Sequence, residues 1–289
     1  MATLSDWLEG ARVRTLPAAV SPVLIGTGAA AGLGQASVSR ALLAAGVALA
    51  LQVGVNFAND YSDGVRGTDD VRTGPPRLTG GGKASPAVVK RAALLALGVG
   101  ALLGLMLVAV SGTWWLLVVG AVAIVAAWGY TGGSRPYGYR GLGEVGVLLF
   151  FGLFATLGTT WTQALELSWP AWAGAVGVGL IACALLMVNN IRDIPTDSLV
   201  GKMTLAVRLG DRRARLTYVA MITAPLLLAV ACALVAPWSL LTLLVVPWVV
   251  RLARTVLGGA QGRDLIAVLR DTGLLELGYS ILLGVGLAL

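Results

Sequence analysis

Residues 171–197 read AWAGAVGVGLIACALLMVNNIRDIPTD, and this stretch decides the class of fold. Residues 171–191 contain no charged side chain, and a helix needs about 20 predominantly apolar residues to cross a bilayer. The stretch becomes polar over residues 189–197, where asparagine, arginine and aspartate follow one another. We therefore expect a transmembrane helix that continues out of the bilayer as a polar motif.

The remainder of the chain has the same apolar character. Of its 289 residues, 57% are hydrophobic and 12% are charged, about half the charged fraction of an ordinary soluble domain. There is no histidine, and Cys183 and Cys232 both lie in apolar segments, so any metal ion must be held by oxygen. The sequence predicts an all-α polytopic membrane protein with nine transmembrane helices, the other eight at about 16–33, 41–59, 87–110, 113–130, 142–163, 214–235, 237–254 and 268–289.

The positive charges predict how these helices are oriented. Twenty of the 21 lysine and arginine residues fall in alternate connections, and Arg40 is the exception. Cytoplasmic loops are rich in Lys and Arg because translocating these residues is disfavoured. We therefore expect a multi-pass protein of the cell (plasma) membrane with a cytoplasmic N-terminus and an external C-terminus. The net charge of +7 then requires no nucleic-acid partner, because membrane lipid or a phosphate-bearing substrate accounts for it.

Two polar strips lie at the predicted cytoplasmic ends of the second and sixth helices. The first is NFANDYSDGVRGTDD over residues 56–70, and the second is NNIRDIPTD over residues 189–197. Residues four apart share a helix face, so each strip would present amide and carboxylate oxygens on one side. Two such faces would repel one another without a cation, and Mg²⁺ takes oxygen ligands and substrate phosphates. The candidate metal ligands are Asn56, Asn59, Asp60, Asp63, Asn189, Asp193 and Asp197.

Basic residues accompany both strips. Arg66 and Arg77 follow the first strip, Lys202 follows the second, and Arg135 lies in the connection over residues 130–141. Carboxylates for Mg²⁺ together with cations for non-bridging oxygens describe a diphosphate site. Cytoplasmic retention also explains any one of these cations taken alone.

The connection over residues 130–141 adds aromatic side chains at the same level. It reads YTGGSRPYGYRG, whose glycines and proline predict turns. Its three tyrosines are either interfacial anchors or aromatic faces for a cation. With Mg²⁺, a diphosphate site and a membrane-embedded body, they favour an allylic prenyl diphosphate as substrate. Metal and basic residues would stabilise the departing diphosphate, and a nearby acceptor would capture the allylic cation.

The motifs resemble those of a known family. NDYSD at residues 59–63 and DIPTD at residues 193–197 are similar to the two aspartate motifs of the UbiA superfamily of intramembrane aromatic prenyltransferases. Within it, the chain resembles the branch that prenylates 1,4-dihydroxy-2-naphthoate, through NDYSDGVRGTD, YTGG, PYGY, NNIRDIPTD, GKMTLAVRLG and ARVRTLP. The resemblance covers nearly the whole chain and implies a single prenyltransferase domain over residues 1–289. It also implies nine helices around a central cavity open to lipid, with a cytoplasmic cap formed by loops 60–86 and 192–213.

The resemblance further implies an activity. It is the Mg²⁺-dependent transfer of a polyprenyl chain from polyprenyl diphosphate to 1,4-dihydroxy-2-naphthoate, with release of diphosphate and CO₂, giving demethylmenaquinone. The reaction centre would lie on the cytoplasmic side of the membrane.

Roles for single residues follow from the same resemblance. Asp60, Asp63, Asp193, Asp197 and Tyr130 would be catalytic, and Tyr130 would face the allylic cation. Arg66, Arg77, Arg135 and Lys202 would bind diphosphate, and Arg14, Tyr137 and Tyr139 would bind the acceptor. The ubiquinone-type pattern has a further aspartate where this chain has Gly67, so whether Asp69 completes the first metal site stays open.

Three alternatives remain at this point. Asp63-Gly64-Val65-Arg66 superficially matches the opening of the CDP-alcohol phosphotransferase motif, but that motif is continuous, whereas the two strips here are far apart in the sequence. A secondary transporter would place acids near the bilayer midplane, and Glu276 is the acidic residue that supports this reading. Within the superfamily, a different aromatic acceptor is also compatible with the spacing.

Overall fold

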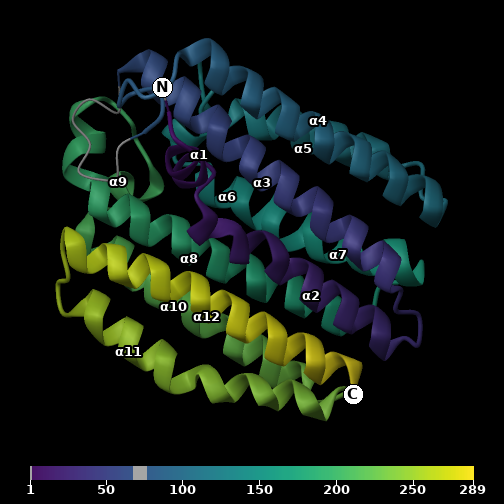
Figure 1. Ribbon diagram of the computed structural model, residues 1–289. Coiled ribbons are helices and arrows are strands. Elements are labelled where there is room, and N and C mark those ends of the chain that lie inside the picture. Colours follow the sequence, from purple (N-terminus) through teal and green to yellow (C-terminus); the bar gives the residue numbers. More distant parts are fainter. Residues whose placement is uncertain (1, 68–76) are drawn as a thin grey trace.

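The computed structural model describes residues 2–67 and 77–289, apart from the side chain of Arg14. The described residues form helices and connections, with no β-strand among them. The long helices lie alongside one another, and the two chain termini are at opposite ends of the bundle (Figure 1). The prediction of an all-α fold is therefore confirmed.

The elements follow the predicted apolar segments closely. In chain order they are α1 (Leu4–Gly10), η1 (Val13–Thr15), α2 (Leu16–Gly32), α3 (Val38–Arg66), α4 (Pro86–Ser111), α5 (Leu116–Gly129), η2 (Tyr137–Arg140), α6 (Gly143–Val147), the π-helical η3 (Leu148–Phe154), α7 (Ala155–Ala164), α8 (Trp169–Leu199), α9 (Leu205–Leu209), α10 (Asp211–Cys232), η4 (Pro237–Val245), α11 (Val246–Leu257) and α12 (Arg263–Ala288).

Among the described residues, six helical stretches are long and apolar enough to cross a membrane. These are α3, α4, the continuous stretch Gly143–Ala164, α8, α10 and the stretch Pro237–Leu257, whereas α2 and α5 are shorter apolar helices. Every predicted apolar segment lies on a helical element of the structure. An apolar run is a property of consecutive residues, so the sequence is enough to locate it. The count of nine membrane crossings itself stays a prediction.

Helix α8 is the centre of the bundle. Of its most apolar window, 72% is buried, against 28–33% for the other five long stretches. It packs against α10, α12, α2 and η3. Small residues such as Gly174 and Gly179 allow these neighbours to approach closely. The position of α8 places its polar end among elements from both halves of the chain.

Both motif-bearing helices extend beyond their predicted apolar spans. α3 continues to Arg66 and α8 to Leu199, so residues 60–66 and 192–199 are helical rather than part of the expected cap loops. The prediction that the motif residues occupy helix faces is confirmed. α3 ends where Gly67 adopts φ 72°, a left-handed conformation that favours glycine at a helix C-terminus. An aspartate at this position would be more strained than glycine.

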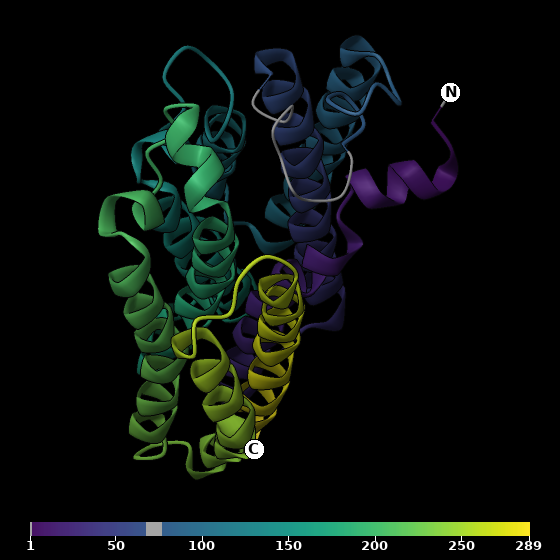
Figure 2. The same ribbon diagram turned by 90° about the vertical axis from the view of Figure 1, so that its left-hand side faces the viewer.

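Helix α1 is set apart from the bundle. It runs across the direction of the long helices (Figure 2), and Lys83 holds it through a 2.6 Å ion pair with Asp6. Hydrogen bonding to Lys83 lowers the pKa of the Asp6 carboxyl below its usual range.

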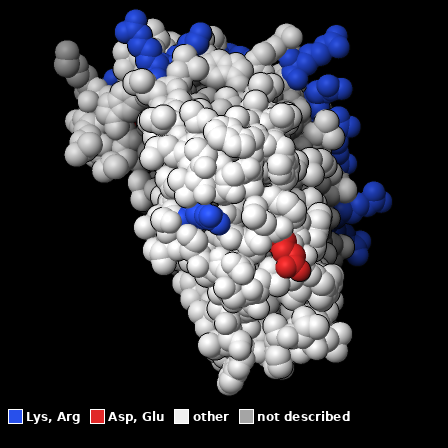
Figure 3. All heavy atoms as spheres, turned by 90° about the vertical axis from the view of Figure 1, so that its right-hand side faces the viewer, with Lys and Arg blue, Asp and Glu red and all other residues white. Residues whose placement is uncertain are grey.

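The opposite end of the bundle carries few charges: Figure 3 shows a face that is mostly uncharged, with Lys and Arg gathered along its margins.

Candidate active site

A long cavity opens beside the polar ends of α3 and α8. Its volume is about 1000 Å³, and it extends from the motif residues down between α2, α3, α4, α5 and α7. Asn56, Asn59, Asn189 and Arg192 line its polar end, while leucine, valine, alanine and phenylalanine side chains line the rest. A concave, mostly apolar site with a few convergent polar groups is typical of a ligand pocket.

On α3, the residues Asn59 and Asp63 face a connection that comes from the middle of the chain. The Thr131 hydroxyl donates to Oδ1 of Asn59 at 2.7 Å, and the Tyr139 hydroxyl donates to Oδ1 of Asp63 at 2.6 Å. These are i,i+4 positions on one helix face, as the sequence predicts. The connection over residues 130–141 is therefore held against the first motif.

The side chain of Asp60, one residue after Asn59, does not contact the connection over residues 130–141 in this way and is bound by backbone groups. Its side chain is fully buried, and its two carboxylate oxygens accept the backbone N–H groups of Leu78 at 2.9 Å and Thr79 at 2.8 Å. Asn56 likewise uses its amide nitrogen to hold the N-terminal segment, donating to the Ala11 carbonyl at 2.9 Å. The structure thus places Asp60 at an anchor for the chain before α4. Like Asp63, Asp193 and Asp197, it is not among the residues that line the cavity.

On α8, the acids of the second motif are paired with cations. Arg192 forms two 2.7 Å bonds to the carboxylate of Asp193 through Nε and Nη2, and its Nη2 also donates to Oδ1 of Asn189 at 2.9 Å. The Arg192 side chain is 5% exposed and contributes to the cavity lining. Sequence reasoning did not assign Arg192 to the site, although its place inside NNIRD was a usable signal.

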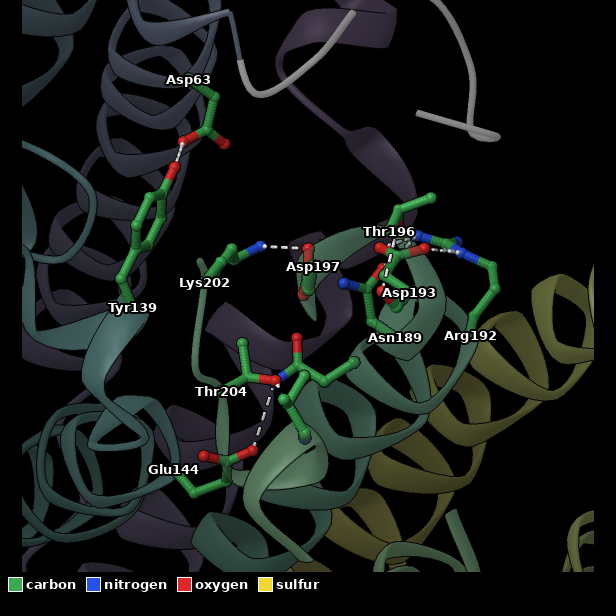
Figure 4. A network of polar contacts seen from close by, with 12 residues as sticks. Asp63, Tyr139, Glu144, Asn189, Arg192, Asp193, Thr196, Asp197, Lys202 and Thr204 are labelled. Atoms are coloured by element: carbon green, nitrogen blue, oxygen red, sulfur yellow. Dashed lines mark hydrogen bonds and ion pairs between the residues drawn. The ribbon is translucent and has the colours of Figure 1, made fainter. Parts of the chain in front are cut away.

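Lys202 and Tyr139 connect the two motifs. Lys202 Nζ lies 3.3 Å from Oδ1 of Asp197 and 5.4 Å from the centroid of the Tyr139 ring, while the hydroxyl of Tyr139 binds Asp63. Figure 4 shows Asp63, Tyr139, Lys202 and Asp197 in this order across the polar end of the site. Residues that are far apart in sequence are therefore joined at one end of the bundle.

The other predicted basic residues have separate positions. Arg77 lines the cavity. Arg66 donates to the carbonyls of Thr131, at 2.5 Å, and Gly133, so its guanidinium holds the connection instead of lining the cavity. Arg135 is exposed and outside the cavity lining. The side chain of Arg14 and the whole of Asp69 lie outside the described residues.

Two tyrosines form an aromatic wall of the cavity. Tyr130 and Tyr137 both line it, with ring centroids 5.4 Å apart in an edge-to-face arrangement. Burial raises the pKa of Tyr137 to about 12. Both tyrosines offer aromatic faces to the cavity.

The donor set at this end of the bundle fits Mg²⁺ in its chemistry. Within residues 2–67 and 77–289, no three carboxylates converge into a ready-made metal centre. Asn59 and Asp63 on α3 and Asn189, Asp193 and Asp197 on α8 nevertheless supply the amide and carboxylate oxygens that Mg²⁺ prefers. Arg192 and Lys202 form ion pairs with the α8 acids Asp193 and Asp197.

The fold and the site define a class: a helical membrane protein with a mostly apolar cavity whose polar end is lined by Asn and Arg side chains of two motifs. The sequence profile of the UbiA prenyltransferase family matches residues 19–265. The chain therefore belongs to the UbiA prenyltransferase family and is a transferase, which confirms the resemblance drawn from the motifs.

Two relatives with the same name are similar to most of the chain. The chain is 51% identical over 288 residues to 1,4-dihydroxy-2-naphthoate octaprenyltransferase of Mycobacterium tuberculosis, covering 100% of this chain and 98% of that protein. It is 39% identical over 260 residues to the protein of the same name from Escherichia coli, covering 87% and 84% respectively.

Solved structures show the same fold at low sequence identity. The apo structure of a UbiA homologue from Aeropyrum pernix gives a TM-score of 0.70 at 18% identity, covering 95% of this chain and 98% of that one. A UbiA homologue from Archaeoglobus fulgidus, bound to DMAPP and Mg²⁺, gives 0.65 at 13% identity, covering 96% and 99%.

Proposed function

We propose that the protein transfers a polyprenyl chain from its diphosphate to 1,4-dihydroxy-2-naphthoate. The observation that carries this proposal is the cavity of about 1000 Å³, whose polar end is lined by residues of both motifs and whose remainder is mostly apolar, as an isoprenoid chain requires. Relatives named for this acceptor, covering nearly the whole chain, support the choice of acceptor. The family membership argues against a secondary transporter.

The diphosphate would bind at the polar end. Arg77 and Arg192 line the cavity there, and Lys202 stands at its rim between the motifs. Arginine offers bidentate contacts to phosphate oxygens and lysine a point charge. These cations would stabilise the negative charge that develops as the allylic C–O bond breaks, which is the step in which electrostatic stabilisation contributes most.

Asn59, Asp63, Asn189, Asp193 and Asp197 would hold Mg²⁺, which would supply further charge stabilisation to the leaving diphosphate. The Tyr130 and Tyr137 faces would stabilise the allylic cation and exclude water from it. The new C–C bond forms at the ring carbon that carries the carboxylate. Loss of that carboxylate as CO₂ leaves the electron pair in the ring and gives demethylmenaquinone in its quinol form.

We further propose that this chemistry takes place at the cytoplasmic face of the cell membrane. The distribution of lysine and arginine along the sequence supports this orientation.

The purified protein tests the proposal directly. It is incubated with farnesyl diphosphate, 1,4-dihydroxy-2-naphthoate and Mg²⁺, and released diphosphate and prenylated product are measured by enzyme-coupled assay and mass spectrometry. We expect product with the carboxylate lost, and no turnover with EDTA in place of Mg²⁺. Product from 4-hydroxybenzoate but not from dihydroxynaphthoate would keep the transferase chemistry and reject the acceptor.

A further inference from the structure

Two arginines and one buried carboxylate form a second polar site, on the outside of the bundle. Arg251 lies on α11 and Arg270 and Asp271 lie on α12. They line a separate hollow of about 410 Å³ together with Pro247 and Trp248. Among the described residues, this hollow shares none with the lining of the large cavity.

Asp271 fixes both guanidinium groups. Its Oδ1 accepts Nε and Nη2 of Arg270 at 2.9 and 2.8 Å, and its Oδ2 accepts Nη2 of Arg251. The carboxylate is 9% exposed, whereas the arginine side chains are 67% and 62% exposed. The acid is therefore inside and the two cations face outward, each with donors beyond those that the carboxylate engages, because a guanidinium carries five.

The site lies near the ends of α11 and α12 that the short connection joins. Arg270 is seven residues beyond the first residue of α12, and Arg251 is six residues before the last residue of α11. At a rise of 1.5 Å per residue, both lie about 10 Å from the connection that joins the two helices. α11 forms one edge of the bundle beside α12 (Figure 1), so the hollow faces the surroundings of the helices.

The charges at the site require one anion. Two guanidinium groups and one carboxylate leave a net charge of +1, which is costly close to hydrocarbon without a counter-charge. A phosphodiester carries one negative charge, and its two non-bridging oxygens match the guanidinium fork. Trp248 adds the amphipathic ring that is favoured at membrane interfaces.

We infer that Arg251, Arg270 and Asp271 form a binding site for the phosphodiester of an anionic membrane phospholipid, separate from the reaction centre. Retention of positive charge in the cytoplasm explains exposed arginines in general. It does not explain a buried carboxylate that fixes two of them around a hollow. Arg254, one turn further along α11, is exposed and lies outside this hollow, which makes it the matched comparison.

Native mass spectrometry of the full-length protein in neutral detergent tests the inference. The protein is titrated with phosphatidylglycerol, with phosphatidylcholine, and with phosphatidylglycerol in the presence of inorganic phosphate. We expect saturable binding of phosphatidylglycerol that phosphatidylcholine does not reproduce and inorganic phosphate does not displace. Equal binding of phosphatidylcholine would overturn the charge requirement, and displacement by inorganic phosphate would identify a free-anion site instead.

Two variants with the same change in net charge sharpen the test. The triple variant Arg251→Gln/Arg270→Gln/Asp271→Asn removes two positive charges and one negative charge. The control Arg254→Gln removes one positive charge, so both variants lower the net charge by one. At about fivefold for each guanidinium contact that the phosphodiester loses, we expect the triple variant to bind phosphatidylglycerol about 25-fold more weakly. The control should stay within about twofold of the parent protein.

Folding is checked from the melting temperature without added lipid. If the triple variant does not fold, Arg251→Gln alone serves, because Arg270 still pairs with Asp271 and the buried carboxylate stays compensated. The single variant should lose about fivefold in affinity. Unchanged phosphatidylglycerol binding in a folded variant would overturn the inference.

Discussion

Asp60 and Asp63 lie almost one helical turn apart on α3, and the structure gives their carboxylates different surroundings. Asp60 is enclosed and accepts two backbone N–H groups from residues 78 and 79. Asp63 accepts a hydrogen bond from the Tyr139 hydroxyl. The ring of Tyr139 also contacts Lys202, which follows the second motif. The same residue type in one motif therefore has two environments: Asp60 is held by backbone N–H groups, and Asp63 is held by a side-chain hydroxyl from the connection over residues 130–141.

Amide substitutions at these two acids should have different effects. Asp60→Asn replaces one acceptor oxygen by a donor that faces a backbone N–H, which we expect to cost about 1–3 kcal/mol of stability. Asp63→Asn keeps an acceptor for Tyr139 but loses the charge needed for a divalent cation, so kcat should fall at least about 100-fold with an unchanged melting temperature. Both quantities are measured on each purified variant, by thermal unfolding in detergent and by the prenyl transfer assay.

The opposite pattern would reverse the assignment. An Asp60→Asn protein of normal stability without activity, together with an active Asp63→Asn protein, would place Asp60 at the reaction centre. Tyr61→Phe is a suitable control, because Tyr61 lies between these two acids on α3 and its ring packs against Trp128 of α5, a contact that phenylalanine keeps.

At the scale of elements, close helix contacts depend on glycine. α2 and α12 approach so closely that a Cβ on Gly28 would lie 2.1 Å from the backbone oxygen of Gly284. Because backbone atoms cannot turn away as a side chain can, the two helices would have to separate. This contact also fixes α2 beside the cavity, whose lining includes Ala18, Ala19 and Val23.

Alanine substitutions at two helical glycines test the importance of this contact. Gly28→Ala should destabilise the protein by about 1–3 kcal/mol through overpacking. Gly98→Ala on α4 is the control, because a Cβ there meets nothing within 4 Å. The control should be neutral or stabilising by up to about 1 kcal/mol, because alanine is the better helix former. Equal melting temperatures for the two variants would show that α2 and α12 can separate at little cost.

At the scale of the whole molecule, charge placement predicts which side of the membrane each connection occupies. Glu166 lies in the connection between α7 and α8, and Arg212 lies in the first turn of α10 at the motif end. Both are exposed, whereas Cys183 and Cys232 are buried. Single cysteines at these two positions can therefore report on the two sides separately.

We expect opposite labelling of the two positions in intact cells. In a background where Cys183 and Cys232 are replaced by alanine, Glu166→Cys should react with a membrane-impermeant maleimide. Arg212→Cys should react only after the cells are permeabilised, because positively charged connections stay in the cytoplasm. Reaction of Arg212→Cys in intact cells would place the reaction centre on the outer side.

The sequence by itself determined the helical membrane class, the helices that carry the motifs and the family. These properties follow from hydropathy, charge and spacing along consecutive residues, and the continuation of α3 and α8 as polar helix ends follows from the same local pattern. Tertiary structure alone decided which motif side chains reach the cavity. Asp60 accepts the backbone N–H groups of residues 78 and 79. Arg66 donates to the carbonyls of Thr131 and Gly133. Arg192 donates to the side chains of Asp193 and Asn189. Asp60 and Arg66 bind partners outside the motifs that packing brings near, and helix spacing alone does not reveal these contacts.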